Sequence, residues 1–195
     1  MKIAVIVGST RPGRVSDRLA KWVATNLATV KSNQVTTLDL ADYALPFLDE
    51  PISPQYNPDR KPNAVAQKWL AALADADAYV IVTPEYNRSF SAVLKNALDY
   101  VDFQLAKKPV AIVGHGSTGG AQAVGQLRGV IPGLHAVTTP NAVYFSFRAG
   151  EVLDEQGNLN ETISAMPNGP TAALAKLVEE LTWYGEALFA ARSKS

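Results

Sequence analysis

Short runs of apolar residues constrain the fold of this chain more than any other feature. The run Ile3–Val7 is wholly apolar, mostly β-branched, and stops at Gly8. A strand with one wet face alternates with a period of two residues, so an unbroken apolar run predicts a strand covered on both faces. Similar runs at 79–82 and 110–113 are followed by proline or glycine, and they predict two further buried strands.

Two more strands and a series of helices complete the pattern. Residues 35–40 alternate more strongly and predict an edge strand, and a fifth strand is expected at about 136–145. Alternating helices and buried strands are typical of an α/β fold with right-handed crossovers. We therefore expect a three-layer, doubly wound, five-stranded parallel sheet with the order 2-1-3-4-5. Apolar residues at helical spacing predict the helices, at 15–30, 65–73, 93–101, 120–131 and 171–191.

The length of the chain predicts one domain. Its 195 residues fall within the usual range for a single domain, and no internal repeat or linker divides them, so one domain over 1–195 is expected. Two stretches, 44–62 and 148–170, fall outside the alternation of strands and helices. They are either lids, arms or partner contacts, or surface insertions without a role.

The composition argues against several kinds of binding site and reaction. The 18 Lys and Arg residues balance 18 Asp and Glu residues, which argues against a nucleic-acid surface or a polybasic membrane patch. With no Cys and two His, the chain has no thiol chemistry and almost no ligands for a metal site. The first apolar run is too short for a signal peptide or a membrane span, so we expect a cytoplasmic protein without membrane insertion.

Three loops are expected where the strand order reverses, which is where ligands bind in a doubly wound sheet. The first, 8–16, has hydroxyl groups, the guanidinium groups of Arg11 and Arg14, and the N–H groups of a helix start, all of which suit a phosphate. The spacing of its glycines resembles a P-loop, but the required Lys and Ser/Thr are Arg14 and Val15, which excludes a triphosphate site. The alternative is a capped helix with solvated arginines.

The second and third loops suit a flat ring. The second, 83–89, combines an aromatic side chain, an amide and several backbone donors. Glu85 has no carboxylate or histidine partner near it in sequence, which leaves a hydrolase pairing unsupported. In the third loop, 114–120, four glycines favour backbone that lies against a ligand. His115 in this loop is either a contact to a ring edge or loop, or a solvated histidine.

The segment from Pro84 to Tyr100 carries the most specific motif. It reads PEYNRSFSAVLKNALDY and is similar to PEYNxSxPGxLKNAIDW of the NADPH-dependent FMN reductase family, whose members are flavodoxin-like. The first loop, with Gly8-Ser9-Thr10-Arg11 and Ser16, resembles the family's phosphate loop, and Ser117-x-Gly119-Gly120 resembles its third flavin loop. The family's Pro-Gly pair is Ser91-Ala92 here, and Ser91 can still start a helix.

This resemblance implies that FMN binds at the three loops. The phosphate would be held by Ser9, Arg11 and Ser16, with Arg14 in addition. Residues 84–87 would line the isoalloxazine ring through backbone groups, and the third loop would close its far edge. The expected cofactor-binding residues are Ser9, Arg11, Arg14, Val15, Ser16, Pro84, Glu85, Tyr86, Asn87, Arg88, Ser89, His115, Gly116, Ser117, Gly119 and Gly120.

The resemblance also implies a reaction. A hydride would pass from NADPH or NADH to N5 of FMN and then to a quinone, azo, chromate or flavin acceptor by a ping-pong mechanism. FMN would carry the chemistry, so no catalytic side chain and no metal are expected. The alternatives are a flavodoxin-type electron carrier, which the neutral charge disfavours, and an FMN-binding sensor without NAD(P)H turnover. A serine hydrolase is disfavoured by the missing nucleophile elbow.

The family resemblance extends to assembly. Its members form homodimers, often paired into homotetramers. In this chain the segment 100–103 and the pair Trp183-Tyr184 are candidate apolar anchors for such contacts. The alternative is that these aromatic residues pack in the core of their own chain.

Overall fold

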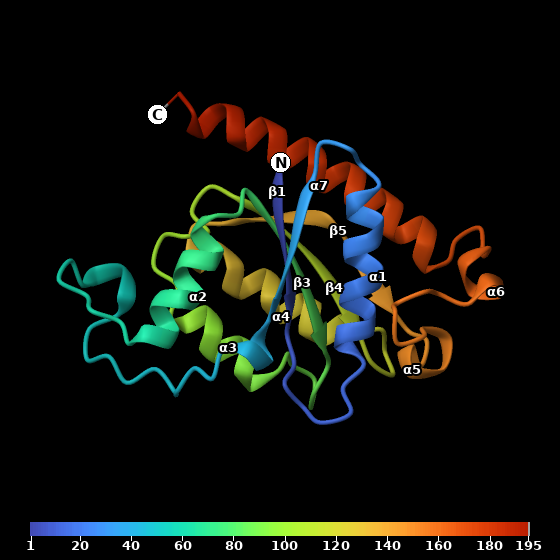
Figure 1. The fold of residues 1–195 in the computed structure, drawn as a ribbon, viewed down its shortest axis with the longest axis horizontal. Helices are drawn as coiled ribbons and strands as arrows, with labels where there is room; N and C mark the ends of the chain where they lie inside the picture. Colours follow the sequence, from blue (N-terminus) through green and yellow to red (C-terminus); the bar gives the residue numbers. More distant parts are fainter. Residues whose placement is uncertain (195) are drawn as a thin grey trace.

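Figure 1 shows the computed structural model of the protein, which describes residues 1–194. In this part of the chain five parallel strands form one sheet with the order β2-β1-β3-β4-β5. The predicted fold class and strand order are therefore confirmed. The strands are β1 (Lys2–Val7), β2 (Gln34–Asp39), β3 (Ala78–Pro84), β4 (Pro109–His115) and β5 (Val137–Phe145).

Helices cover both faces of the sheet, which gives the three layers. Buried side chains of α1 and α7 pack on one face, and those of α2, α3 and α4 pack on the other. The helices are α1 (Ser16–Ala28), α2 (Ala64–Ala74), α3 (Ala92–Asp99), α4 (Ala121–Val130), α5 (Ala149–Val152), α6 (Glu161–Ser164) and α7 (Pro170–Arg192), with short 3-10 helices η1 (Leu40–Asp42), η2 (Pro54–Tyr56) and η3 (Ile131–Leu134). No helix within residues 1–194 is both long and apolar enough to span a membrane.

The central strands are apolar throughout because each of their faces meets a helical layer. In β1, Ile3 and Val5 belong to the cluster under α1 and α7, whereas Ala4 and Ile6 belong to the cluster under α2 and α3. Side chains alternate between the two faces of a strand, so a strand buried on both faces reads as a continuous apolar run. This packing fixes the carboxyl ends of β1, β3 and β4 side by side.

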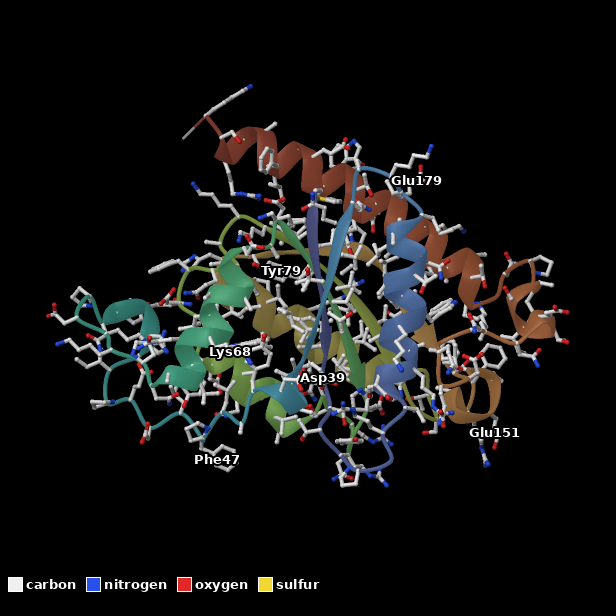
Figure 2. The ribbon with its side chains drawn as sticks, in the orientation of Figure 1. Asp39, Phe47, Lys68, Tyr79, Glu151 and Glu179 are labelled. Carbon is white, nitrogen blue, oxygen red and sulfur yellow. The ribbon has the colours of Figure 1, made fainter. Side chains whose placement is uncertain are left out.

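The segment 44–62 is an arm that extends along α3 and beyond α2 (Figure 1). Asn96 on α3 accepts a hydrogen bond from the backbone N–H of Leu48 at 3.0 Å. Further along the arm, the guanidinium of Arg60 forms an ion pair at 3.2 Å with Asp102, which follows α3. The arm is thus fixed to the body of the protein by side chains near both of its ends. The side chain of Phe47 is 81 % exposed and points away from the arm in Figure 2.

The second irregular stretch, 148–170, folds against the first helix. It contains α5 and α6 and an isolated bridge between Leu153 and Leu159. The guanidinium of Arg18 donates a hydrogen bond to the carbonyl of Leu153 at 3.3 Å, and the amine of Lys21 donates one to Glu155 at 2.6 Å. Both bonds come from α1, so this stretch is anchored on the helix that begins at the first loop.

Ser91 begins α3, as the sequence predicts. Its hydroxyl oxygen accepts a hydrogen bond from the N–H of Leu94 at 3.2 Å, which is the geometry of a helix N-cap. The same hydroxyl donates to the carbonyl of Gly8 at the end of β1. Ser91 therefore starts α3 and also joins the start of this helix to the end of β1.

Candidate functional site

The three predicted loops meet at one edge of the sheet and enclose a cavity of about 240 Å³. The first loop follows β1, the second follows β3 and the third follows β4, which are neighbours in the sheet. Predicted residues from all three loops line the cavity, namely Arg11, Arg14, Val15, Ser16, Pro84, Glu85, Tyr86, His115 and Gly116, together with Gly13. The other predicted residues, Ser9, Asn87, Arg88, Ser89, Ser117, Gly119 and Gly120, belong to the same loops but not to the cavity lining.

The start of α1 gives the cavity features that suit an anion. Within residues 1–194 no side chain caps the first turn of this helix, whose N-cap residue is Val15. The N–H groups of a first helical turn have no partner inside the helix, and they carry the positive end of the helix dipole. Arg11 also lines the cavity, and its guanidinium has no ion-pair partner in the described part of the chain. Both features suit a phosphate group.

Arg14 is used differently from Arg11. Its guanidinium forms an ion pair with Asp39 and donates a hydrogen bond to the carbonyl of Ser9 at 2.8 Å. Asp39 is the last residue of β2 and lies at the carboxyl end of that strand (Figure 2). Arg14 therefore fixes the first loop against the neighbouring strand, and Asp39 supports the site through Arg14, a role that the sequence analysis did not predict.

Hydrogen bonds join each of the three loops to the other two. The hydroxyls of Ser9 and Tyr86, from the first and second loops, are 3.0 Å apart. Ser16 Oγ and His115 Nε2 join the first loop to the third at 2.8 Å. Glu85 in the second loop accepts hydrogen bonds from the hydroxyl of Thr118 and the N–H of Gln122, each at 3.0 Å.

These contacts form a closed ring around the cavity. Glu85 places its carboxylate at the start of α4, where the helix dipole favours a negative charge. A site whose loops are already bonded to one another needs little reorganisation to accept a ligand.

The tip of the second loop has a strained backbone. Asn87 and Arg88 have φ values of +49° and +66°, which are uncommon for residues other than glycine. Tyr86 and Ser89 exchange backbone hydrogen bonds on either side of them, at 2.7 and 3.0 Å. Gln126 on α4 holds this turn in place, because its side-chain amide donates to the carbonyl of Arg88 at 3.0 Å and accepts from the hydroxyl of Ser89 at 2.6 Å. No motif in the sequence predicts this role of Gln126.

The glycines of the third loop are required by the packing of the loop itself. Gly120 has a φ of +77°, and a Cβ atom there would lie 2.5 Å from the backbone nitrogen of His115. Gly119 has a φ of +68°, and its Cβ would lie 3.0 Å from Tyr144. Gly116, with a φ of +144°, lies against Glu85. The loop can therefore fold tightly against β4 and β5 only with glycine at these positions.

His115 is neutral at neutral pH. Its side chain is 8 % exposed, and burial lowers its pKa from 6.5 to about 4, because the charged imidazolium loses its hydration. Within residues 1–194 no group of three or more His, Cys, Asp or Glu residues is arranged to hold a metal ion. The positive groups at the cavity are therefore Arg11, Arg14 and the start of α1, and of these Arg14 is paired with Asp39.

The residues around the cavity fit the phosphate end of FMN. The cavity is smaller than the roughly 300–1,000 Å³ usual for drug-sized ligands, so it suits a phosphate and the start of a ribityl chain better than a whole flavin. The tip residues Asn87 and Ser117 lie outside it and are exposed. A flat ring would lie between these two loops, near the aromatic ring of Tyr86.

The fold and the site together define a flavodoxin-like oxidoreductase that uses FMN. Residues 1–150 match the family described as NADPH-dependent FMN reductase. The chain belongs to this family, a class of NAD(P)H-dependent oxidoreductases, and the family expected from the motifs is confirmed.

Individual relatives agree with this assignment. The NAD(P)H-dependent FMN reductase ntnL of Nectria sp is 36 % identical over 154 residues, which cover 76 % of this chain and 77 % of the relative. The 2-hydroxy-1,4-benzoquinone reductase of Burkholderia sp is 34 % identical over 168 residues, or 82 % and 85 % of the two chains. Among solved structures, FerB, a flavoenzyme NAD(P)H:(acceptor) oxidoreductase from Paracoccus denitrificans, has a TM-score of 0.70 at 24 % identity. The match covers 95 % of this chain and 97 % of FerB, and it supports the fold.

Proposed function

We propose that this protein is an FMN-dependent NAD(P)H oxidoreductase in which residues 1–195 act as one domain. The observation that carries the proposal is the cavity at the start of α1, enclosed by three mutually bonded loops and positively charged through Arg11. When bound there, FMN supplies the redox chemistry, since it accepts a hydride from NADPH or NADH and then reduces a second substrate in a ping-pong sequence.

The side chains and backbone of the protein bind and orient the cofactor. Arg11, Ser16 and the N–H groups at the start of α1 hold the phosphate. Ser9 bonds to Tyr86 and keeps the phosphate loop in register with the ring-binding loop. Arg14 is bound to Asp39 and fixes the shape of the loop, so its contribution to the phosphate is indirect.

The acceptor is a small molecule that reduced FMN can reduce. Quinones, azo compounds, chromate and free flavin are the candidates that the family resemblance suggests. The relative from Burkholderia sp is named as a hydroxybenzoquinone reductase, which favours a quinone. The tips of the second and third loops are exposed, and nicotinamide and acceptor would use the same face of the flavin in turn.

We propose that the protein works in the cytoplasm as a homodimer or homotetramer. Phe103 is 56 % exposed and Trp183 is 65 % exposed, and both are candidates for contacts between copies. Tyr100 and Val101, by contrast, are buried in the core of their own chain. The anchors expected from the segment 100–103 are thereby reduced to Phe103.

Rapid mixing of the FMN-loaded protein with a nicotinamide tests the reaction. Mixed without oxygen with NADPH or NADH, the flavin absorbance at about 450 nm should fall, and it should recover when a quinone is added. Bleaching without recovery would exclude a quinone as the acceptor. If neither nicotinamide bleaches the flavin, the protein is an electron carrier or a sensor and the proposed activity is wrong.

Removal of one positive charge tests the cofactor site. Arg11→Gln should weaken FMN binding by roughly 10- to 100-fold, the usual contribution of a hydrogen bond to a charged group. Lys31→Gln removes the same charge from an exposed turn between α1 and β2, at the opposite edge of the sheet, and should leave the affinity unchanged. Equal affinity in the two variants would contradict the placement of the phosphate.

A further inference from the structure

A buried histidine of the third loop contacts the phosphate loop in the wall of the cavity. The Nε2 atom of His115, at the end of β4, lies 2.8 Å from Oγ of Ser16 in the first turn of α1. Ser16 is 1 % exposed and His115 is 8 % exposed. Both residues line the cavity at the start of the helix, so this pair is part of its wall.

We infer that His115 is a positioning residue that turns the hydroxyl proton of Ser16 toward the phosphate of FMN. The inference rests on the proposed function. It assigns His115 to the phosphate end of the site, whereas the sequence suggested a contact to the ring edge or a solvated histidine.

The argument follows from what each group can donate. A serine hydroxyl has one proton to donate and two lone pairs to accept with, and a neutral imidazole has one N–H and one bare nitrogen. A phosphate dianion only accepts, so Ser16 must donate its proton to it. The hydroxyl then accepts from His115, which requires the proton of the imidazole to be on Nε2. In the opposite arrangement Ser16 would donate to His115 and present its lone pairs to the anion.

The surroundings of His115 favour this role over direct binding of the anion. Its Nε2 atom is already occupied by Ser16, and burial keeps the ring uncharged, so it adds no positive charge to the cavity. Its own backbone is held in place as well, because its carbonyl accepts a hydrogen bond from the N–H of Glu85 at 2.9 Å. A side chain so constrained can hold a neighbouring hydroxyl in one orientation.

Such a residue affects the phosphate end of the flavin and not the ring. Riboflavin has the same ring and ribityl chain as FMN but no phosphate. Loss of the His115 donor should therefore weaken the binding of FMN while the binding of riboflavin stays the same. General damage to the site would weaken the binding of both flavins.

Titration of the full chain with each flavin, followed by flavin fluorescence, tests the inference. His115→Leu removes the donor and should reduce the ratio of FMN to riboflavin affinity about tenfold. His115→Gln places an N–H close to the same position and should restore most of that ratio. His135→Asn replaces the other histidine, which stacks on Phe103 far from the loops, and should behave as the unmodified protein.

The pairing with Ser16 provides a second test. In a Ser16→Ala background, His115→Leu should cause no further loss of the ratio, because the hydroxyl that it orients is gone. An unchanged ratio in His115→Leu, or equal losses with and without Ser16, would overturn the inference. If the unmodified chain binds neither flavin, the proposed function itself fails, which is a different result from normal FMN binding that does not depend on His115.

Discussion

A methyl group at Gly120 should destabilise the protein, whereas the same methyl five residues further along should stabilise it. Gly120 precedes α4 with a φ of +77°, and a Cβ atom there would lie 2.5 Å from the nitrogen of His115 and 2.7 Å from the carbonyl carbon of Gly114. Both neighbours are backbone atoms of the buried strand β4, so neither can move aside alone. Gly125 lies inside α4 with no atom within 4 Å of its Cβ position.

The two effects have opposite signs and separate causes. Alanine in a left-handed conformation costs about 1–2 kcal/mol, and overpacking adds about 1–3 kcal/mol. Gly120→Ala should therefore lower the free energy of unfolding by about 2–5 kcal/mol. Gly125→Ala should raise it by about 0.5–1 kcal/mol, because alanine loses less backbone entropy than glycine on entering a helix.

Urea unfolding measures both values. The fluorescence of the buried Trp22 and Trp69 reports the transition, and an unchanged slope with denaturant shows that the unfolded states are comparable. The displaced backbone of His115 should also weaken FMN binding in Gly120→Ala but not in Gly125→Ala. If both variants unfold at the same urea concentration, the third loop is free to shift, and the reasoning from its tight packing is wrong.

Two further changes test the site through stability. Acidification from pH 6.5 to 4 should lower the free energy of unfolding of the cofactor-free protein by up to about 3 kcal/mol. In this range the unfolded chain binds a proton at His115, whereas the folded chain, in which the pKa of His115 is lowered to about 4, does not. Urea unfolding of His115→Gln should lack this component, and an identical pH dependence in the two proteins would contradict the prediction. Arg88→Gly should raise the free energy of unfolding by about 1 kcal/mol, since glycine adopts the φ of +66° at Arg88 without strain, and a melting temperature at or below that of the unmodified protein would refute this.

The framework of the fold was readable from the sequence because it depends on burial alone. Strands β1, β3 and β4 are covered on both faces, and their apolar runs have no other simple explanation in a chain of this size. The helical periods and the change from strand to loop at Gly8 follow from local preferences. These rules hold for each segment separately, so they need no knowledge of which segments meet.

The hydrogen-bonded pairs inside the site could not be predicted from the sequence, because they depend on which distant segments meet. Ser16 and His115 are separated by 99 residues, and Ser9 and Tyr86 by 77, and no spacing rule connects them. The sequence indicated hydroxyls and a histidine but not which of them would face one another. Gln126 gave no signal, because an exposed glutamine on a helix surface is ordinary until the turn that it holds is known.

The glycines of the third loop and the arginines of the first loop have structural roles that differ from those expected from the sequence. The glycines of the third loop suggested close approach to a ligand, but at Gly119 and Gly120 the chain's own backbone already requires them. Arg11 and Arg14 looked equivalent in sequence, yet only Arg14 has a carboxylate partner, Asp39. Local sequence indicates that a position is special, whereas the cause depends on contacts made by distant parts of the chain.

The rigidity of the site follows from where its loops begin. The first, second and third loops start at the ends of β1, β3 and β4, which lie next to one another in the sheet at a spacing of about 4.8 Å. The distances between the loops are therefore set by backbone hydrogen bonds in the core, and the side-chain pairs only join groups that the sheet has already brought together. Because little conformational freedom is left to lose, the binding free energy of a phosphate at this edge is not spent on ordering the loops. The net charge of zero is also compatible with anion binding, because the field that matters at this site is the local one of the α1 start and Arg11.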